Sequence, residues 1–186
     1  EALEHYNAAL AIDARQPRTL NNRATALAFL KCHADALRDY DSALALDMGF
    51  ADALANRALS LRELGRLADA LKDCDHALAL NPAHADAHVN RANVLSDLNR
   101  HGEAGDHYAR ALSAKPDYAF LRGLALHARM KVCDWREHHA RAAELTRMLD
   151  AGAKASPPLP VLALTDDLKR HHAAASLWVH EQHPQQ

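Results

Sequence analysis

The segment HVNRANVL, residues 88–95, contains a triplet that recurs along the chain. Asn90-Arg91-Ala92 is preceded by two identical triplets, Asn56-Arg57-Ala58 and Asn22-Arg23-Ala24. Each begins 34 residues after the one before it. A fixed period of this length is typical of stacked structural repeats, in which neighbouring units bury a shared core.

Small residues recur at the same period. The chain aligned with itself gives three full copies, at residues 17–50, 51–84 and 85–118. Alanine occupies the eighth, twentieth and twenty-seventh places of every copy: Ala24, Ala58, Ala92, Ala36, Ala70, Ala104, Ala43, Ala77 and Ala111. A larger side chain where two helices touch would overpack the contact and cost about 1–3 kcal/mol. These places therefore predict close contacts between helices.

The period and its alanines resemble the tetratricopeptide repeat. The resemblance implies an all-α fold: a right-handed superhelical solenoid of two-helix repeats followed by a helical tail. Residues 1–16, beginning EALEHYNAALAID, match the second half of a repeat, so the sequence is expected to be a piece of a longer protein. The expected organisation is a half repeat at 1–16, three repeats, a helical capping segment at 119–156 and a Pro-rich linker with a helix at 157–186.

The composition and charge of the chain argue against two classes of partner, nucleic acids and membranes. Acidic and basic residues are mixed and the net charge is −2, which gives no basic footprint for nucleic acid. No stretch approaches the roughly 20 apolar residues that span a bilayer, so we expect a cytoplasmic protein without a membrane contact. Cys32, Cys74 and Cys133 form no CxxC pair and are expected to be buried, reduced thiols.

The asparagine of the triplet is the candidate binding residue. The resemblance places Asn22, Asn56 and Asn90 on the first helix of each repeat, which lines the concave groove. An asparagine amide can bond a peptide's backbone N–H and C=O without selecting its side chains. We expect these three residues, with Asn93, to bind an extended polypeptide. The alternative is that they bond within or between helices and fix the repeat geometry.

The arginines of the triplet, at the seventh place, are predicted to pair with carboxylates on the second helix. Asp39 and Asp73 are the candidates, and the third copy has His107 instead. Chaperone-binding repeats clamp a C-terminal carboxylate with basic residues at the fifth, ninth, twelfth and thirteenth places. Those places here contain one basic residue, Arg62, which disfavours a clamp.

The tail leaves the period after Tyr118. The sequence predicts a helix to about Val132, a capping box of Asp134 and Glu137 before a second helix, an extended SPPLP linker, and a final helix capped by Thr165 or Asp166. The order FLRGLALHARMKVCDW, helix, PPLPVLALTDD resembles the junction between repeats and catalytic region in bacterial SPINDLY-type O-linked N-acetylglucosamine transferases.

That resemblance, over roughly residues 119–183, implies a parent glycosyltransferase that uses a nucleotide sugar and holds its acceptor protein in the repeat groove. No nucleotide-binding lobe is present in these 186 residues, so we expect no enzyme activity, catalytic residue or cofactor here. The alternative is a stand-alone scaffold that assembles protein complexes. His84 and His88 have chelating spacing but no third ligand, so no metal is expected. Exposed solenoid ends would allow self-association.

Overall fold

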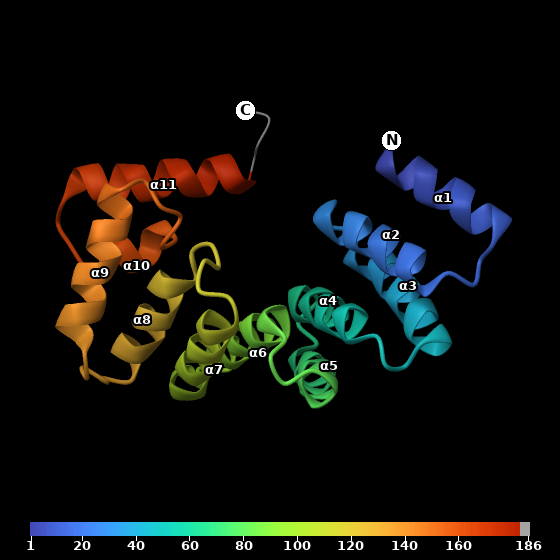
Figure 1. Cartoon of the computed structure of the whole chain (residues 1–186), viewed down its shortest axis with the longest axis horizontal. Coiled ribbons are helices and arrows are strands. Elements are labelled where there is room, and N and C mark those ends of the chain that lie inside the picture. The colour runs from blue at the N-terminus through green and yellow to red at the C-terminus, as the bar shows by residue number, and fades with distance from the viewer. Residues whose placement is uncertain (183–186) are drawn as a thin grey trace. The chain divides into compact units, whose positions relative to one another are not determined.

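The computed structural model describes residues 1–182, and these residues contain helices and connecting loops but no strand. Figure 1 shows the helices in chain order. The chain divides within helix α6 (Ala85–Asp97) into two compact units, Glu1–Val94 and Leu95–Gln186, and each is described by itself. The all-α prediction is confirmed.

Antiparallel helix pairs form the first unit. Its helices are α1 (Ala2–Ile12), α2 (Pro17–Phe29), α3 (His33–Leu46), α4 (Ala51–Glu63), α5 (Leu67–Leu80) and the first part of α6. Each of the first four packs against the next along the chain. The starts of α2, α4 and α6 are spaced by 34 residues, as are those of α3 and α5. The predicted period therefore corresponds to one helix pair.

The predicted small contacts are buried. All nine repeat alanines have no exposed surface. Larger residues fill the spaces around them, and Ala58, Ala70 and Cys74 form one core cluster with Leu61 and Val94. Because the space at these contacts fits only a methyl group, the alanine pattern fixes how closely the helices approach.

The turn between the two helices of a pair has one backbone conformation in all three repeats. Lys31, Gly65 and Asn99 occupy the same repeat place and have positive φ angles of 63°, 73° and 59°. Glycine adopts this left-handed conformation freely, and asparagine tolerates it better than lysine does. The turn is thus set by the packing of the helices rather than by its local sequence.

The second unit continues with α7 (His101–Ala114), α8 (Leu121–Lys131), α9 (His138–Asp150), the short α10 (Pro158–Leu162) and α11 (Leu168–Gln182). A tight contact joins α8 to the segment before α10. The Gly123 N–H donates to the Ala155 carbonyl at 3.0 Å, and a Cβ on Gly123 would lie 1.9 Å from Ser156 Oγ. The tail packs on α8 as a folded part of this unit.

Three details of the predicted tail are wrong. Asp134 does not cap α9, because its carboxylate accepts two 2.8 Å bonds from Arg136, and α9 begins only at His138. The Arg136 guanidinium also holds the pKa of Asp134 well below its usual range. Much of SPPLP is helical rather than extended, as α10 begins at Pro158. Asp167, not Thr165 or Asp166, precedes α11 and accepts the Lys169 N–H at 2.9 Å.

The cysteine prediction is wrong at two places. Cys74 is buried in the repeat core, but Cys32 and Cys133 are exposed. Cys32 lies in the turn before α3 and Cys133 in the turn after α8, where no packing layer covers them. The predicted tail segment 157–186 includes residues 183–186, which lie outside the described residues.

Candidate functional site

The exposed stripe of each first helix forms the candidate site in the Glu1–Val94 unit. On α2 the exposed residues Arg18, Asn22, Thr25 and Phe29 follow a spacing of four, three and four, which places them on one helix face. The same places on α4 hold Asp52, Asn56, Leu59 and Glu63, of which only Asn56 is half-buried. On α6 Asp86 is exposed, whereas Asn90 and Asn93 are half-buried.

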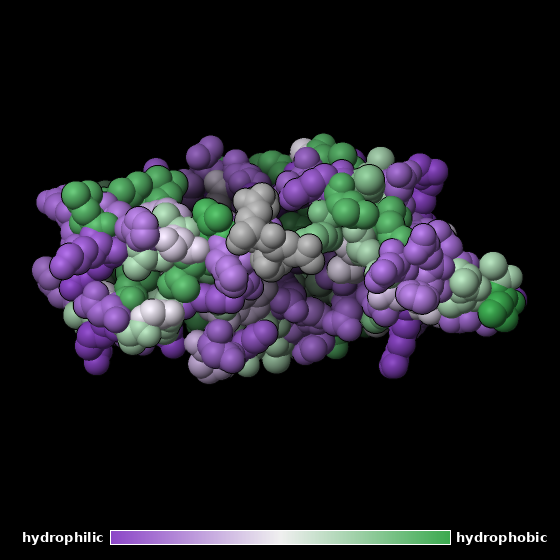
Figure 2. Space-filling view, turned by 90° about the horizontal axis from the view of Figure 1, so that it is seen from above, coloured by the Kyte–Doolittle hydropathy of each residue, from purple (hydrophilic) through white to green (hydrophobic). Residues whose placement is uncertain are grey.

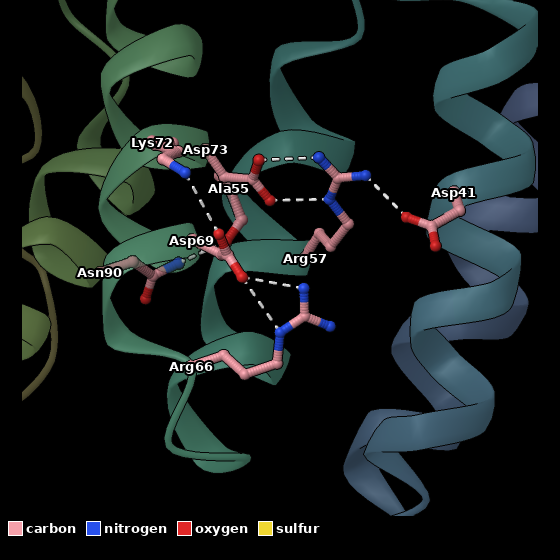
Figure 3. A network of polar contacts seen from close by, with 8 residues as sticks. All are labelled: Asp41, Ala55, Arg57, Arg66, Asp69, Lys72, Asp73 and Asn90. Carbon is pink, nitrogen blue, oxygen red and sulfur yellow. Dashed lines mark hydrogen bonds and ion pairs between the residues drawn. The ribbon is translucent and has the colours of Figure 1, made fainter.

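The asparagines of this face bond from one repeat to the one before it. Asn56 Nδ2 donates to Asn21 Oδ1 at 3.1 Å, and Asn90 Nδ2 donates to the Ala55 carbonyl at 2.9 Å. Asn21 and Ala55 share the fifth repeat place, so one contact recurs with two kinds of acceptor. Figure 3 shows Asn90 reaching Ala55. These bonds fix the spacing of neighbouring first helices.

Asn22 and Asn56 differ in how much of their side-chain hydrogen-bonding capacity is used within the protein. Asn22 is exposed, and its carbonyl accepts a long 3.3 Å bond from the Asn21 amide. Asn56 uses one N–H, and its side-chain carbonyl makes no bond within the described residues. The contacts agree with the structural alternative for Asn56 and Asn90. They do not test peptide binding by Asn22, Asn56, Asn90 and Asn93, which stays a prediction.

The arginines pair with the predicted carboxylates. Arg23 donates through two guanidinium nitrogens to Asp39, both at 2.6 Å, and Arg57 does the same to Asp73 at 2.7 Å. The side chains of Asp39 and Asp73 are each only 10% exposed, so the pairs are largely desolvated. Hydrogen bonding to Asp73 raises the Arg57 pKa above its usual value. The prediction for Asp39 and Asp73 is confirmed.

Each arginine also reaches back to the preceding pair, which the sequence analysis missed. Arg57 Nη1 lies 2.6 Å from Asp41, and Arg91 Nε lies 2.7 Å from Asp75. Figure 3 shows Arg57 between Asp73 and Asp41. Each backward partner lies 16 residues before its arginine. This constant offset was visible in the sequence and could have identified both residues.

These arginines lie in clefts between successive second helices. A cleft of about 250 Å³ is lined by Arg57, Asp41 and Asp73, and by Arg66 and Asp69 from the next turn. The cleft around Arg23 has the equivalent lining one repeat earlier. Arg57 is neutralised by Asp73 and Asp41, and Arg23 by Asp39, while Arg23 Nη1 also donates to Asn7 Oδ1 at 2.9 Å. Both arginines therefore hold repeats together and leave no free charge for a ligand.

Histidine pairs do not assemble a metal site. His84 Nδ1 accepts the Ala87 N–H at 3.2 Å and its Nε2 lies 2.8 Å from Asp52, so His84 caps the start of α6. His88 Nε2 contacts the Pro82 carbonyl. Within residues 1–182 no three metal-binding side chains come together. Over the same residues, no helix has the length and hydropathy needed to cross a bilayer.

Apolar residues are exposed singly beside this polar face. Phe29 is 74% exposed and Leu59 is 37% exposed. Figure 2 shows apolar and polar side chains interspersed on the face of the molecule seen from above. The candidate site therefore offers amides, separate apolar side chains and charges, a mixture suited to an extended polypeptide.

Comparison with known proteins identifies the repeats. Residues 51–84 and 85–118 each match a family model described as tetratricopeptide repeat. No curated protein sequence matches the chain. The predicted fold class is confirmed, since the matched repeats agree with the observed helix pairs and solved tetratricopeptide structures share the fold.

Three solved structures illustrate the fold. MamA is 18% identical, with 78% of this chain and 89% of that chain covered and a TM-score of 0.64. Pseudomonas aeruginosa pilF is 22% identical, with 78% and 66% covered and a TM-score of 0.67. The first tetratricopeptide domain of Spaghetti (RPAP3), bound to the HSP90 peptide SRMEEVD, is 23% identical, with 64% and 93% covered and a TM-score of 0.57.

Proposed function

We propose that the chain binds an extended polypeptide along the exposed faces of α2, α4 and α6. The observation that carries the proposal is the stripe of exposed polar and apolar side chains on α2, with Asn22 at its centre. Asn56 and Asn90 occupy the equivalent place on α4 and α6, and we call Asn22, Asn56 and Asn90 the amide row. Backbone bonding by these amides would hold a chain in extended form, while Phe29 and Leu59 contact its side chains.

A clamp for a C-terminal carboxylate is disfavoured by the charge of this face. Arg62 is the one basic residue at the usual clamp places, and its Nη1 lies 3.2 Å from the Glu63 carboxylate. The structural neighbour that binds an HSP90 peptide shares the fold at 23% identity. The partner proposed for this chain is an internal polypeptide segment instead.

We further propose that this segment belongs to an acceptor protein of a cytoplasmic O-linked N-acetylglucosamine transferase. The support is the resemblance of the tail, FLRGLALHARMKVCDW and PPLPVLALTDD, to the junction before the catalytic region in SPINDLY-type enzymes. The second candidate is a scaffold without an enzyme. The parent reading frame distinguishes them: two nucleotide-binding lobes after Gln186 support the transferase, and an unrelated domain contradicts it.

Selection of peptides from a random library on the immobilised chain tests the binding function. Asn22→Ala should lower the affinity of the selected peptides roughly tenfold, which corresponds to the loss of at least one hydrogen bond between neutral groups. Its melting temperature should match the parent, because Asn22 makes no bond between repeats. Ser42→Ala on α3 is the matched control, since that hydroxyl is exposed and bonds only the Arg38 carbonyl.

Asn56→Ala and Asn90→Ala, unlike Asn22→Ala, affect structure as well as binding. Each removes an inter-repeat bond, so each should cost about 0.5–1.5 kcal/mol of stability as well as weaken binding. If Asn22→Ala binds the selected peptides as tightly as the parent, or if no peptide is selected, the amide row is not the binding site.

A further inference from the structure

A cavity of about 630 Å³ lies at one end of the α2 stripe. The loop between α1 and α2 supplies Arg15, the start of α2 supplies Pro17 and Arg18, and the loop between α3 and α4 supplies Asp47 and Phe50. Two arginines thus line a hollow that is also lined by a proline and a phenylalanine. Arg18 lies one helical turn before Asn22, on the same exposed face.

Arg15 and Arg18 differ from the other arginines of the Glu1–Val94 unit, because neither guanidinium has a protein partner among the described residues. The other arginines of the unit are all ion-paired: Arg23, Arg38, Arg57, Arg62, Arg66 and Arg91. Asp47 lines the same cavity and keeps its negative charge, and its Oδ1 accepts the Gly49 N–H at 3.0 Å. Two arginines against one aspartate leave the cavity with a net positive charge.

The equivalent places in the next two repeats have the opposite sign. Arg18 is replaced by Asp52 on α4 and by Asp86 on α6. The first turn of α2 contains no acidic residue, whereas those of α4 and α6 do. All three side chains are exposed, so the buried core does not require this reversal, although Asp52 also lies 2.8 Å from His84 Nε2. The reversal distinguishes one end of the binding face from the other.

We propose that the Arg15–Arg18 cavity binds a carboxylate side chain of the polypeptide held by the amide row, so that the partner is acidic where it passes α2. This inference rests on the proposed binding function. Paired guanidinium groups donate several N–H bonds to one carboxylate. Pro17 and Phe50 contact the methylene stem of a glutamate. Asp52 and Asp86 disfavour an acidic residue at the equivalent points further along the groove.

The test uses two labelled synthetic peptides, acetyl-Gly-Ser-Glu-Glu-Ser-Gly-amide and its counterpart with both glutamates replaced by glutamine. Fluorescence anisotropy should give a roughly tenfold tighter Kd for the glutamate peptide, the equivalent of one charge-assisted contact. The preference should fall below about twofold in Arg15→Gln/Arg18→Gln and in about 0.5 M NaCl, where exposed charges are screened. Arg38→Gln, an exposed α3 arginine paired with Asp35, is the matched control and should keep it.

The outcomes separate the cavity from the amide row. Equal Kd values for the two peptides, no detectable binding of the glutamate peptide, or a preference that survives the double arginine change overturns the carboxylate site. Asn22→Ala should weaken both peptides equally and leave their ratio unchanged. If it weakens neither while the arginine changes abolish the preference, the carboxylate site stands and the amide-row function is wrong.

Discussion

Replacing Arg57 with leucine tests whether the arginine of the repeated triplet stabilises the packing of the repeats through its ion pairs. Arg57 donates to both oxygens of Asp73 at 2.7 Å and also contacts Asp41 at 2.6 Å. The Asp73 side chain is 10% exposed and that of Arg57 is 24% exposed. Arg57→Leu would leave the Asp73 carboxylate largely buried without its cation.

Breaking a fully buried ion pair from one side costs about 3–5 kcal/mol. Because a quarter of the Arg57 side chain is exposed, water can partly replace the lost bonds. A leucine at this place also recovers some apolar burial, about 1 kcal/mol for a partly buried side chain. The expected net loss for Arg57→Leu is therefore about 2 kcal/mol.

The second change identifies the cause. In Arg57→Leu/Asp73→Leu no charge is left buried, and such replacements of buried pairs are often neutral. The double variant should lie within about 1 kcal/mol of the parent, which gives a coupling energy of about 2 kcal/mol or more between the two residues. Urea denaturation followed by far-ultraviolet circular dichroism gives the free energy of unfolding of the parent, Arg57→Leu, Asp73→Leu and the double variant.

Arg38→Leu is the matched control. Arg38 and Asp35 also form an ion pair, but their side chains are 77% and 51% exposed, and such pairs contribute less than about 1 kcal/mol. If Arg57→Leu unfolds at the same urea concentration as Arg38→Leu, desolvation of Asp73 does not matter and the argument is wrong. If the double variant is as unstable as the single one, the loss comes from packing and not from charge.

Two variants, the pH dependence of stability and a thiol reagent test the packing. Ser60→Ala should stabilise the chain by about 1 kcal/mol in urea denaturation, because the buried Ser60 hydroxyl has no hydrogen-bond partner. Gly123→Ala should lower the melting temperature of the second unit, since the added Cβ collides with Ser156, and overpacking costs at least about 1–3 kcal/mol. Burial raises the pKa of Cys74 from 9.0 to about 12, so stability should fall from pH 9 to 12, as only the unfolded thiol ionises there. A thiol reagent should then label the two exposed cysteines at once and Cys74 only on unfolding.

The repeat core was predictable because it depends on a period. An alanine that recurs at one place in three copies faces the same neighbour in each, and all nine are fully buried. Period also predicts the charge pairs Arg23–Asp39 and Arg57–Asp73, which lie at one offset in two repeats. The backward contacts to Asp41 and Asp75 obey the same rule and needed only a second offset to be considered.

The asparagine contacts were less predictable. Whether Asn56 reaches Asn21 or Asn90 reaches a backbone carbonyl depends on the distance between successive first helices, which sequence spacing does not give. The tail had no period at all. Asp134 there fits a capping box in sequence, yet two arginines compete for it: Arg136 at 2.8 Å and Arg129 at 3.4 Å. Local motifs fail where long side chains offer a stronger partner.

The side chains that pack the repeats and those that face outward carry different information. The places filled by alanine and by the triplet arginine stay constant because each must match the next repeat. The second place of the first helix is exposed in all three repeats, where Arg18, Asp52 and Asp86 differ in charge, and Asp52 also lies 2.8 Å from His84 Nε2. A polypeptide that satisfied only the amides could bind in either direction. On the proposed binding face, the change from arginine to aspartate would give a bound polypeptide a direction, and partner selection should depend on those exposed charges rather than on the repeated asparagines.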